Sequence, residues 1–220
     1  MLQVSIAEEL KTRFPNLVLG CIQGKIKVRT SDDGLWKQIE LLCAKLRTET
    51  TIDEIAQSQP IFQSREAYRL LGKDPTRYRL SSEALLRRVL KGKDLFKINN
   101  AVDINNLVSM VSAFSIGSYD VDKITGPVLF TVGQKGESYI GIGRDTINLE
   151  NLPVFCDKVG HFGSPTSDSE RVMIQPETVN IISIMISFSG QSELNNYLEW
   201  MKELFLKYAE GQEFEIQIIK

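Results

Sequence analysis

The chain has few of the residues that build metal cages and disulfide frameworks. It contains a single histidine and three cysteines, Cys21, Cys43 and Cys156, which stand far apart with no Cys-x-x-Cys pair. One histidine and scattered thiols lack the ligand spacing of a zinc site, and an odd number of lone cysteines is typical of a reducing compartment. We therefore expect no bound metal, no disulfide and a cytoplasmic location.

Long apolar runs and nucleotide-binding motifs are also missing. The N-terminal residues show no basic segment followed by an apolar core, and the longest apolar run, residues 181–188, is too short to cross a bilayer. Gly141-Ile142-Gly143 lacks the third glycine of a dinucleotide fingerprint, and no P-loop lysine pattern occurs. The sequence therefore predicts no secretory signal, no membrane partner and no cofactor.

The composition is that of an ordinary globular protein. With 220 residues, of which 42% are hydrophobic and 25% charged, the chain can bury the core of one large domain or two small ones. The formal net charge of −2 excludes a protein that binds nucleic acid with its whole surface, and no DNA partner is expected. Runs of helices beside runs of strands, without regular βαβ alternation, predict an α+β fold of mixed or antiparallel sheets packed with helices.

Hydrophobic periodicity divides the chain into predicted elements. Helices are expected over 6–14, from 33 to about 46, over 51–72 in two pieces, and over 81–90, 99–114 and 194–208. Strands are expected over 1–5, 17–28, 128–132, 138–142, 152–156, 171–174 and 179–188, with an edge strand over 214–218. Segment 179–188 is rich in isoleucine, which favours a central strand buried on both faces. Residues 1–60 are expected to form an α/β segment that packs on a main domain, residues 61–220.

Basic charge is concentrated in one segment. Between Arg65 and Lys97 there are ten basic and four acidic residues, a net charge of +6, with aromatic residues interleaved. Cations contact phosphates and aromatic rings stack on unpaired bases, so this segment predicts a one-sided RNA contact. A solvated helix face with ion pairs is an alternative of equal weight. The predicted RNA-binding residues are Arg77, Arg79, Arg87, Arg88, Lys91 and Lys93.

Two polar segments are candidates for a site. The asparagine-rich stretch 98–106 suits ligand contacts or, more commonly, the capping of a helix start. Loop 160–171 carries two glycines, a proline, four hydroxyls and Asp168 between two predicted strands. Such a loop can orient a water molecule or hold an ammonium group, and a turn without a ligand is the alternative. The lone His161 in this loop does not make a catalytic triad.

Several stretches, taken in order, resemble a known family. They are residues 81–90, 98–106 with Val108, 117–124, 136–137, and 163–169 followed by 178–184. Over about residues 68–188 the chain resembles the B3/B4 domain of the phenylalanine–tRNA ligase beta subunit, and more closely the free-standing proteins that consist of this domain alone. The resemblance implies an α+β fold and a tRNA or aminoacyl-tRNA partner. In the synthetase this domain hydrolyses the ester of tRNA mischarged with tyrosine.

The sequence departs from the synthetase pattern at two places. The synthetase has a histidine where this chain has Gly117, and Gly-Gly-Glu where it has Gly163-Ser164-Pro165. Asp168 can replace the missing acid, but no residue evidently replaces the histidine. We expect a tRNA-interacting domain, without aminoacylation activity, that either hydrolyses misacylated tRNA in trans or binds it uncleaved. The alternative is a non-catalytic RNA-, small-molecule- or protein-binding module that keeps the fold.

The site is expected between the asparagine-rich stretch, segment 117–122 and loop 164–169. Asp168 is predicted to be the polar base or ammonium acceptor, with Thr166 and Ser167 as positioning groups. The residues predicted to contact the substrate are Asn99, Asn105, Gly117, Tyr119, Asp120, Ser164 and Ser169.

Overall fold

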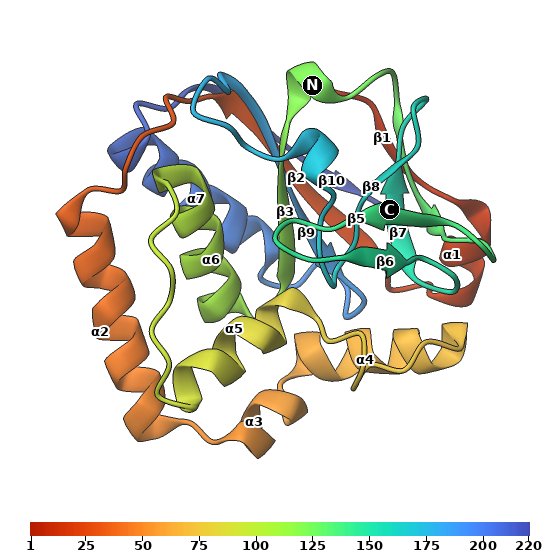
Figure 1. The fold of residues 1–220 in the computed structure, drawn as a ribbon, viewed down its shortest axis with the longest axis horizontal. Coiled ribbons are helices and arrows are strands. Elements are labelled where there is room, and N and C mark those ends of the chain that lie inside the picture. The colour runs from red at the N-terminus through yellow and green to blue at the C-terminus, as the bar shows by residue number, and fades with distance from the viewer.

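The computed structural model describes residues 1–220 as a layer of helices and two four-stranded sheets (Figure 1). The helices are α1 Glu8–Arg13, α2 Asp33–Glu49, α3 Ile52–Gln57, α4 Gln59–Leu71, α5 Ser81–Leu90, α6 Asn100–Ser112 and α7 Leu194–Tyr208, with 3₁₀ turns η1 Val121–Lys123 and η2 Glu170–Val172. The strands are β1 Val4–Ile6, β2 Val18–Lys25, β3 Ser115–Asp120, β4 Val128–Val132, β5 Ser138–Ile140, β6 Thr146–Asn148, β7 Pro153–Cys156, β8 His161–Gly163, β9 Asn180–Ser187 and β10 Gln212–Ile219.

The two large sheets differ in strand direction. One has the order β10-β2-β9-β3 and is antiparallel throughout, while the other has the order β1-β4-β7-β8 and contains the parallel pair β1 and β4. Strands β5 and β6 form a separate hairpin. This arrangement confirms the predicted α+β fold with mixed and antiparallel sheets. The N-terminal segment 1–60 supplies β1 to one sheet and β2 to the other, so it completes both.

Strand β9 lies in the middle of its sheet, as predicted, because both of its faces are covered. Ile181 and Met185 belong to the core beneath the helices, whereas Ile182, Ile184 and Ile186 belong to the core between the two sheets. Side chains alternate between the faces of a strand, so a continuous apolar run fills both cores. The final strand β10 is at the edge of this sheet, which confirms the expected edge strand.

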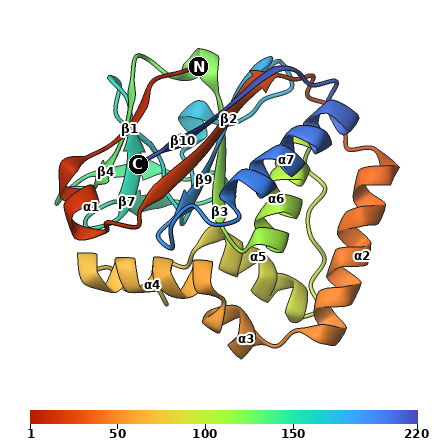
Figure 2. The ribbon, with the colours of Figure 1, turned by 180° about the vertical axis from the view of Figure 1, so that it is seen from behind.

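Helices α5, α6 and α7 cover one side of this sheet, and α2 packs on α5 and α6 farther from the strands (Figure 2). Several begin at side chains that satisfy free backbone N–H groups: Asp32 caps α2, and Thr51 forms a capping box on α3. Asn99 accepts a hydrogen bond from the Val102 N–H at the start of α6. The asparagine-rich stretch therefore places α6, and with it the wall of the cavity described below. None of the helices is long and apolar enough to cross a membrane.

The structure differs from the predicted elements around the polar loop. The strand expected over 171–174 is wrong: η2 occupies this segment, because the Ser169 hydroxyl accepts a hydrogen bond from the Arg171 N–H and starts a helical turn. Strand β8 lies inside the stretch expected to be loop. Strands β3 and β6 were not expected, because they are short and β3 includes Gly117 and two serines, which weaken a strand pattern.

Candidate functional site

A cavity of about 400 Å³ opens between α5, α6, β3 and the loop after β8. Leu85, Val102, Ile116 and Ile174 give it apolar walls. All three predicted segments bring polar groups to it: Asn105 and Asn106 from α6, Ser118 from β3, and Thr166, Ser167 and Asp168 from the loop. Ser81 from α5 and Arg144 from the turn after β5 line it as well. The structure therefore brings the predicted segments 98–106, 117–122 and 164–169 around one space.

Asp168 is the carboxylate of this cavity. Its Oδ1 accepts hydrogen bonds from the Tyr119 hydroxyl at 2.9 Å and from the Ser164 N–H at 3.3 Å. Removal from water, opposed only by these neutral donors, raises the pKa of Asp168 to about 7. No protein donor contacts Oδ2, so this oxygen is free for a ligand in the cavity. Near neutral pH such a carboxylate can take a proton from water or accept an ammonium group.

The rest of loop 164–169 is held by its own hydroxyls and by two buried tyrosines. Ser164 Oγ accepts hydrogen bonds from the N–H groups of Thr166 and Ser167 and donates one to the Ser167 carbonyl. The Tyr139 hydroxyl donates to the same carbonyl at 2.6 Å, and Thr166 Oγ1 lies 2.9 Å from the Tyr68 hydroxyl. Only the Ser167 hydroxyl makes no hydrogen bond within the protein. Ser164 and Thr166 therefore shape the loop, and Ser167 is free to face a ligand.

Gly117 and Gly163 leave room for the Tyr119 hydroxyl. A Cβ at Gly117 would lie 1.9 Å from Tyr119 Oη, and a Cβ at Gly163 would lie 2.3 Å from the same atom. The phenol passes between these two backbone segments to reach Asp168. Burial raises the pKa of Tyr119 well above its ordinary value, so the hydroxyl stays protonated. It therefore serves as a hydrogen-bond donor to Asp168. Gly117 thus contributes space rather than a functional group.

The other predicted contact residues divide between the cavity and its supports. Asn105 lines the cavity, while Asn99 acts as the cap of α6 outside it. Asp120 also lies outside it, because its Oδ2 accepts a hydrogen bond from the Thr178 hydroxyl at 2.7 Å and lies 3.5 Å from Lys123 Nζ. Ser169, as described above, starts η2.

The mouth of the cavity opens into a second hollow of about 360 Å³ that carries two arginines. The Arg88 guanidinium lies 4.3 Å from the centre of the Phe96 ring, which is 66% exposed, and its Nε donates to the Asp94 carbonyl. Arg144, in the turn between β5 and β6, lines both hollows. Neither arginine pairs with an acidic side chain. Asn106 belongs to the asparagine-rich stretch expected at the site, although it was not among the predicted contact residues. Arg144 was not predicted, and the only signal for it in the sequence is that it directly follows Gly141-Ile142-Gly143.

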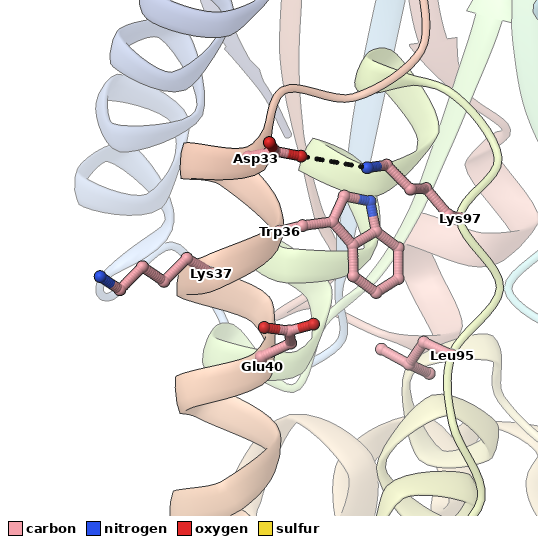
Figure 3. Close-up of a pocket in the computed structure, with 6 residues that line it drawn as sticks. All are labelled: Asp33, Trp36, Lys37, Glu40, Leu95 and Lys97. Atoms are coloured by element: carbon pink, nitrogen blue, oxygen red, sulfur yellow. Dashed lines mark ion pairs between the residues drawn. The ribbon is translucent and has the colours of Figure 1, made fainter.

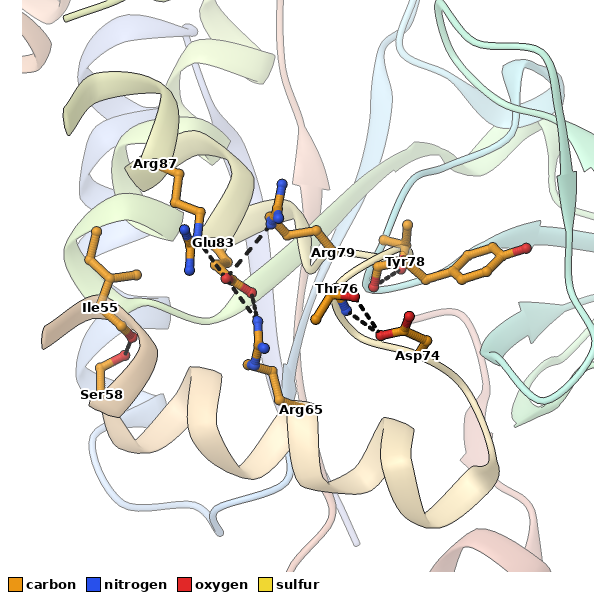
Figure 4. A network of polar contacts seen from close by, with 10 residues as sticks. Ile55, Ser58, Arg65, Asp74, Thr76, Tyr78, Arg79, Glu83 and Arg87 are labelled. Atoms are coloured by element: carbon orange, nitrogen blue, oxygen red, sulfur yellow. Dashed lines mark hydrogen bonds and ion pairs between the residues drawn. The ribbon is translucent and has the colours of Figure 1, made fainter. Parts of the chain in front are cut away.

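Two of the predicted RNA-binding arginines point instead toward a buried acid (Figure 4). Glu83, on α5, is completely buried, and Arg65 from α4 donates to both of its carboxylate oxygens at 2.9 Å. Arg87 Nε donates at 2.7 Å, and Arg79 Nε lies 3.7 Å away without a hydrogen-bond partner. The remaining predicted RNA-binding residues Arg77, Lys91 and Lys93 are exposed.

A separate hollow of about 340 Å³ lies between α2 and the segment before α6 (Figure 3). Trp36 and Leu95 form its apolar part, and Lys97 lies 3.8 Å from Asp33 across it. It shares no lining residue with the cavity of Asp168. No group of three histidine, cysteine, aspartate or glutamate side chains is placed to hold a metal ion.

Comparison with known proteins identifies the family. The family model described as the B3/4 domain matches residues 63–197, which is more than half of the chain and includes every residue that lines the cavity. The chain belongs to the B3/4 domain family. This confirms the resemblance inferred from the sequence motifs.

One curated protein and one solved structure are similar to this B3/4 domain protein. The phenylalanine–tRNA ligase beta subunit of Mycoplasma genitalium is 26% identical over 114 residues, which are 51% of this chain and only 14% of that subunit. The crystal structure of an N-terminal fragment of the phenylalanyl-tRNA synthetase beta subunit from Pyrococcus horikoshii is 16% identical. It aligns with a TM-score of 0.48 over 99% of this chain and 50% of that fragment.

Proposed function

We propose that this B3/4 domain protein binds the aminoacyl end of a tRNA and hydrolyses the ester between the amino acid and the ribose. The observation that carries this proposal is Asp168, a carboxylate with one free oxygen and a pKa of about 7 at the wall of a partly apolar cavity. The matched relative from Mycoplasma genitalium is named as a tRNA ligase subunit, which supports tRNA as the partner.

The groups at the cavity suit the hydrolysis of an ester, which is already reactive. Asp168 takes a proton from a water molecule, whose oxygen attacks the ester carbonyl carbon. The carbon–oxygen bond to the ribose then breaks, and the ribose oxygen receives the proton from Asp168. The Ser167 hydroxyl and the Asn106 amide make no hydrogen bonds within the protein, so they can donate to the negative charge that develops on the carbonyl oxygen.

The mouth suits the nucleic-acid part of the substrate. Arg88 and Arg144 carry charges that no acidic side chain neutralises, and Phe96 exposes its ring beside Arg88. Phosphate groups attract such cations, and unpaired bases stack on exposed aromatic rings. We propose that the RNA approaches along this side of α5, with Lys91 and Lys93 as further phosphate contacts.

A deacylation assay over a panel of misacylated tRNAs tests the proposal. We expect ester loss above background for at least one amino acid, and a reduction of about 100-fold or more for Asp168→Asn. The matched control is Glu170→Gln, which removes an exposed carboxylate from the same loop and should leave the rate unchanged. Absence of ester loss for every tRNA, or an undiminished rate for Asp168→Asn, would contradict hydrolysis.

A second function, binding of aminoacyl-tRNA without cleavage, is favoured by Gly117. The synthetase pattern has a histidine at this position, and Tyr119 Oη fills the space that a side chain there would need. In this case tRNA binding should weaken steeply with rising salt and depend on the aminoacyl group, while the ester stays intact.

A further inference from the structure

A chain of three polar side chains runs from the sheet to the cavity. Ser183 Oγ on β9 lies 2.8 Å from Ser118 Oγ on β3, and Ser118 Oγ donates to Asn105 Oδ1 on α6 at 2.9 Å. A serine hydroxyl has a single proton to donate. Because Ser118 gives its proton to Asn105, the proton between the two serines comes from Ser183. The chain therefore has a direction, and it ends on the amide oxygen of Asn105.

The direction leaves the amide nitrogen of Asn105 facing the cavity. With Oδ1 occupied, the two N–H groups of Nδ2 have no acceptor within the protein. Arg79 Nε is the sole buried side-chain nitrogen or oxygen without a partner, so Nδ2 of Asn105 is open to the space that this residue lines. The nearby Ser109 hydroxyl donates to the Phe114 carbonyl and offers no proton to a ligand.

The surroundings of this donor are largely apolar. Val102, Ile116, Met173 and Ile174 line the same cavity. When a ligand displaces water from such a place, an amide that finds no acceptor on the ligand loses its hydrogen bonds, which weakens binding. A site that donates to an oxygen of its substrate therefore rejects an analogue that lacks this oxygen.

We infer that Asn105 selects the amino-acid side chain and that the cavity takes a neutral side chain with an acceptor oxygen, a hydroxyl or a carboxamide. This inference rests on the proposed function, because it assumes that the cavity holds an aminoacyl group. Aliphatic side chains lack the acceptor. Lysine and arginine offer only donors, and an acidic side chain brings a second negative charge close to Asp168.

Matched pairs of ligands test the inference on the full chain. The probes are adenosines that carry threonine or valine, and asparagine or leucine, through a 3′-amide that the protein cannot hydrolyse as an ester. Calorimetry should show that the oxygen-bearing member of each pair binds at least about tenfold more tightly. Asn105→Leu should abolish or reverse this preference. Asn105→Asp should abolish it as well, because a carboxylate accepts hydrogen bonds but cannot donate them.

Control variants separate selection from folding. Asn195→Leu changes an exposed amide on α7 and should keep the wild-type preference. Ser118→Ala removes the donor that orients the Asn105 amide, and it should weaken the preference even if the Asn105 variants do not fold. A preference for valine and leucine in the wild type, or an unchanged preference in Asn105→Asp, would overturn the inference.

Failure of the inference and failure of the proposed function give different results. Hydrolysis of aminoacyl-tRNA without any preference within the pairs would keep the function and overturn the role of Asn105. Tight, oxygen-dependent binding without hydrolysis would support Asn105 and contradict catalysis. If no probe binds, both are overturned.

Discussion

Glu83 is a fully buried carboxylate and Asp168 is a half-buried one at the wall of a cavity, and their partners differ in charge. Glu83 meets three guanidinium groups within 3.7 Å, while Asp168 meets one phenol and one backbone N–H. The guanidinium groups occupy the oxygens of Glu83, whereas the neutral donors leave Asp168 able to take up a proton near pH 7. Glu83 therefore stabilises the packing of α4 on α5 through Arg65, and Asp168 can act on a ligand.

The same contrast divides the basic segment. Arg65, Arg79 and Arg87 surround Glu83, and Lys73 is buried with its ammonium group donating to the carbonyls of Asn148 and Glu150. These four basic side chains interact with a carboxylate or with carbonyl groups of the protein, so they are not available to a partner. The charge that remains for a partner is at the other end of α5 and at the cavity mouth.

Removal of the Glu83 charge should have the largest effect on stability. Glu83→Gln leaves three arginines around a neutral side chain, two of them well shielded from water. We expect the free energy of unfolding to fall by about 3–5 kcal/mol in urea denaturation. The control Glu66→Gln breaks the exposed pair with Arg69 and should cost less than about 1 kcal/mol. If the free energy of unfolding fell equally in the two variants, the buried ion pairs of Glu83 would contribute no more to stability than an exposed ion pair.

Asp168→Asn should stabilise the protein at alkaline pH. The folded pKa of about 7 lies above the ordinary 3.8, so the folded state holds a proton that the unfolded state has lost, and wild-type stability falls as pH rises from about 4 to 7. Asparagine does not ionise and avoids this loss. Urea denaturation at pH 8 should show a gain of roughly 2–4 kcal/mol over the wild type, and denaturation near pH 4 almost none. A gain that is independent of pH would contradict a raised pKa.

Tyr119→Phe should have a smaller effect. It removes a hydrogen bond to the charged form of Asp168, so the pKa of Asp168 should rise further and the pH profile of hydrolysis should move toward alkaline pH. The free energy of unfolding at pH 8 should fall by about 1 kcal/mol. The control is Tyr197→Phe, because the Tyr197 hydroxyl makes no hydrogen bond, and it should leave the pH profile of hydrolysis unchanged. A shift toward acidic pH would show that the phenol does not stabilise the carboxylate.

The smallest effect is expected at the cavity mouth, and it distinguishes free arginines from compensated ones. Arg144→Gln should weaken tRNA binding and reduce the slope of log affinity against log salt by about 1. Arg79→Gln should leave this slope nearly unchanged, because that side chain faces Glu83. Fluorescence titrations of tRNA at several salt concentrations measure both. A larger change for Arg79 than for Arg144 would place the RNA on the other side of α5.

The sequence was sufficient to predict the fold class, most elements and three of the segments that line the cavity. It did not separate Arg87 from Arg88, which are neighbours in the chain but point to different sides of α5. One contacts Glu83 and the other lines the mouth. A glutamate is usually exposed, so nothing in the sequence indicated that Glu83 is buried. Arg144 became part of the site only because the fold brings the turn between β5 and β6 beside α5 and α6.

The Tyr119 hydroxyl between Gly117 and Gly163 makes three positions depend on one another. A Cβ at Gly117 would lie 1.9 Å from the Tyr119 hydroxyl oxygen and 2.4 Å from the ring carbon that carries it, so loss of the hydroxyl alone does not make room for a side chain there. A histidine at position 117 therefore requires the Tyr119 ring itself to move or to be replaced. Either change withdraws the hydrogen bond from Asp168, so an evolutionary path between this chain and a histidine-containing relative alters the surroundings of Asp168 together with positions 117 and 119.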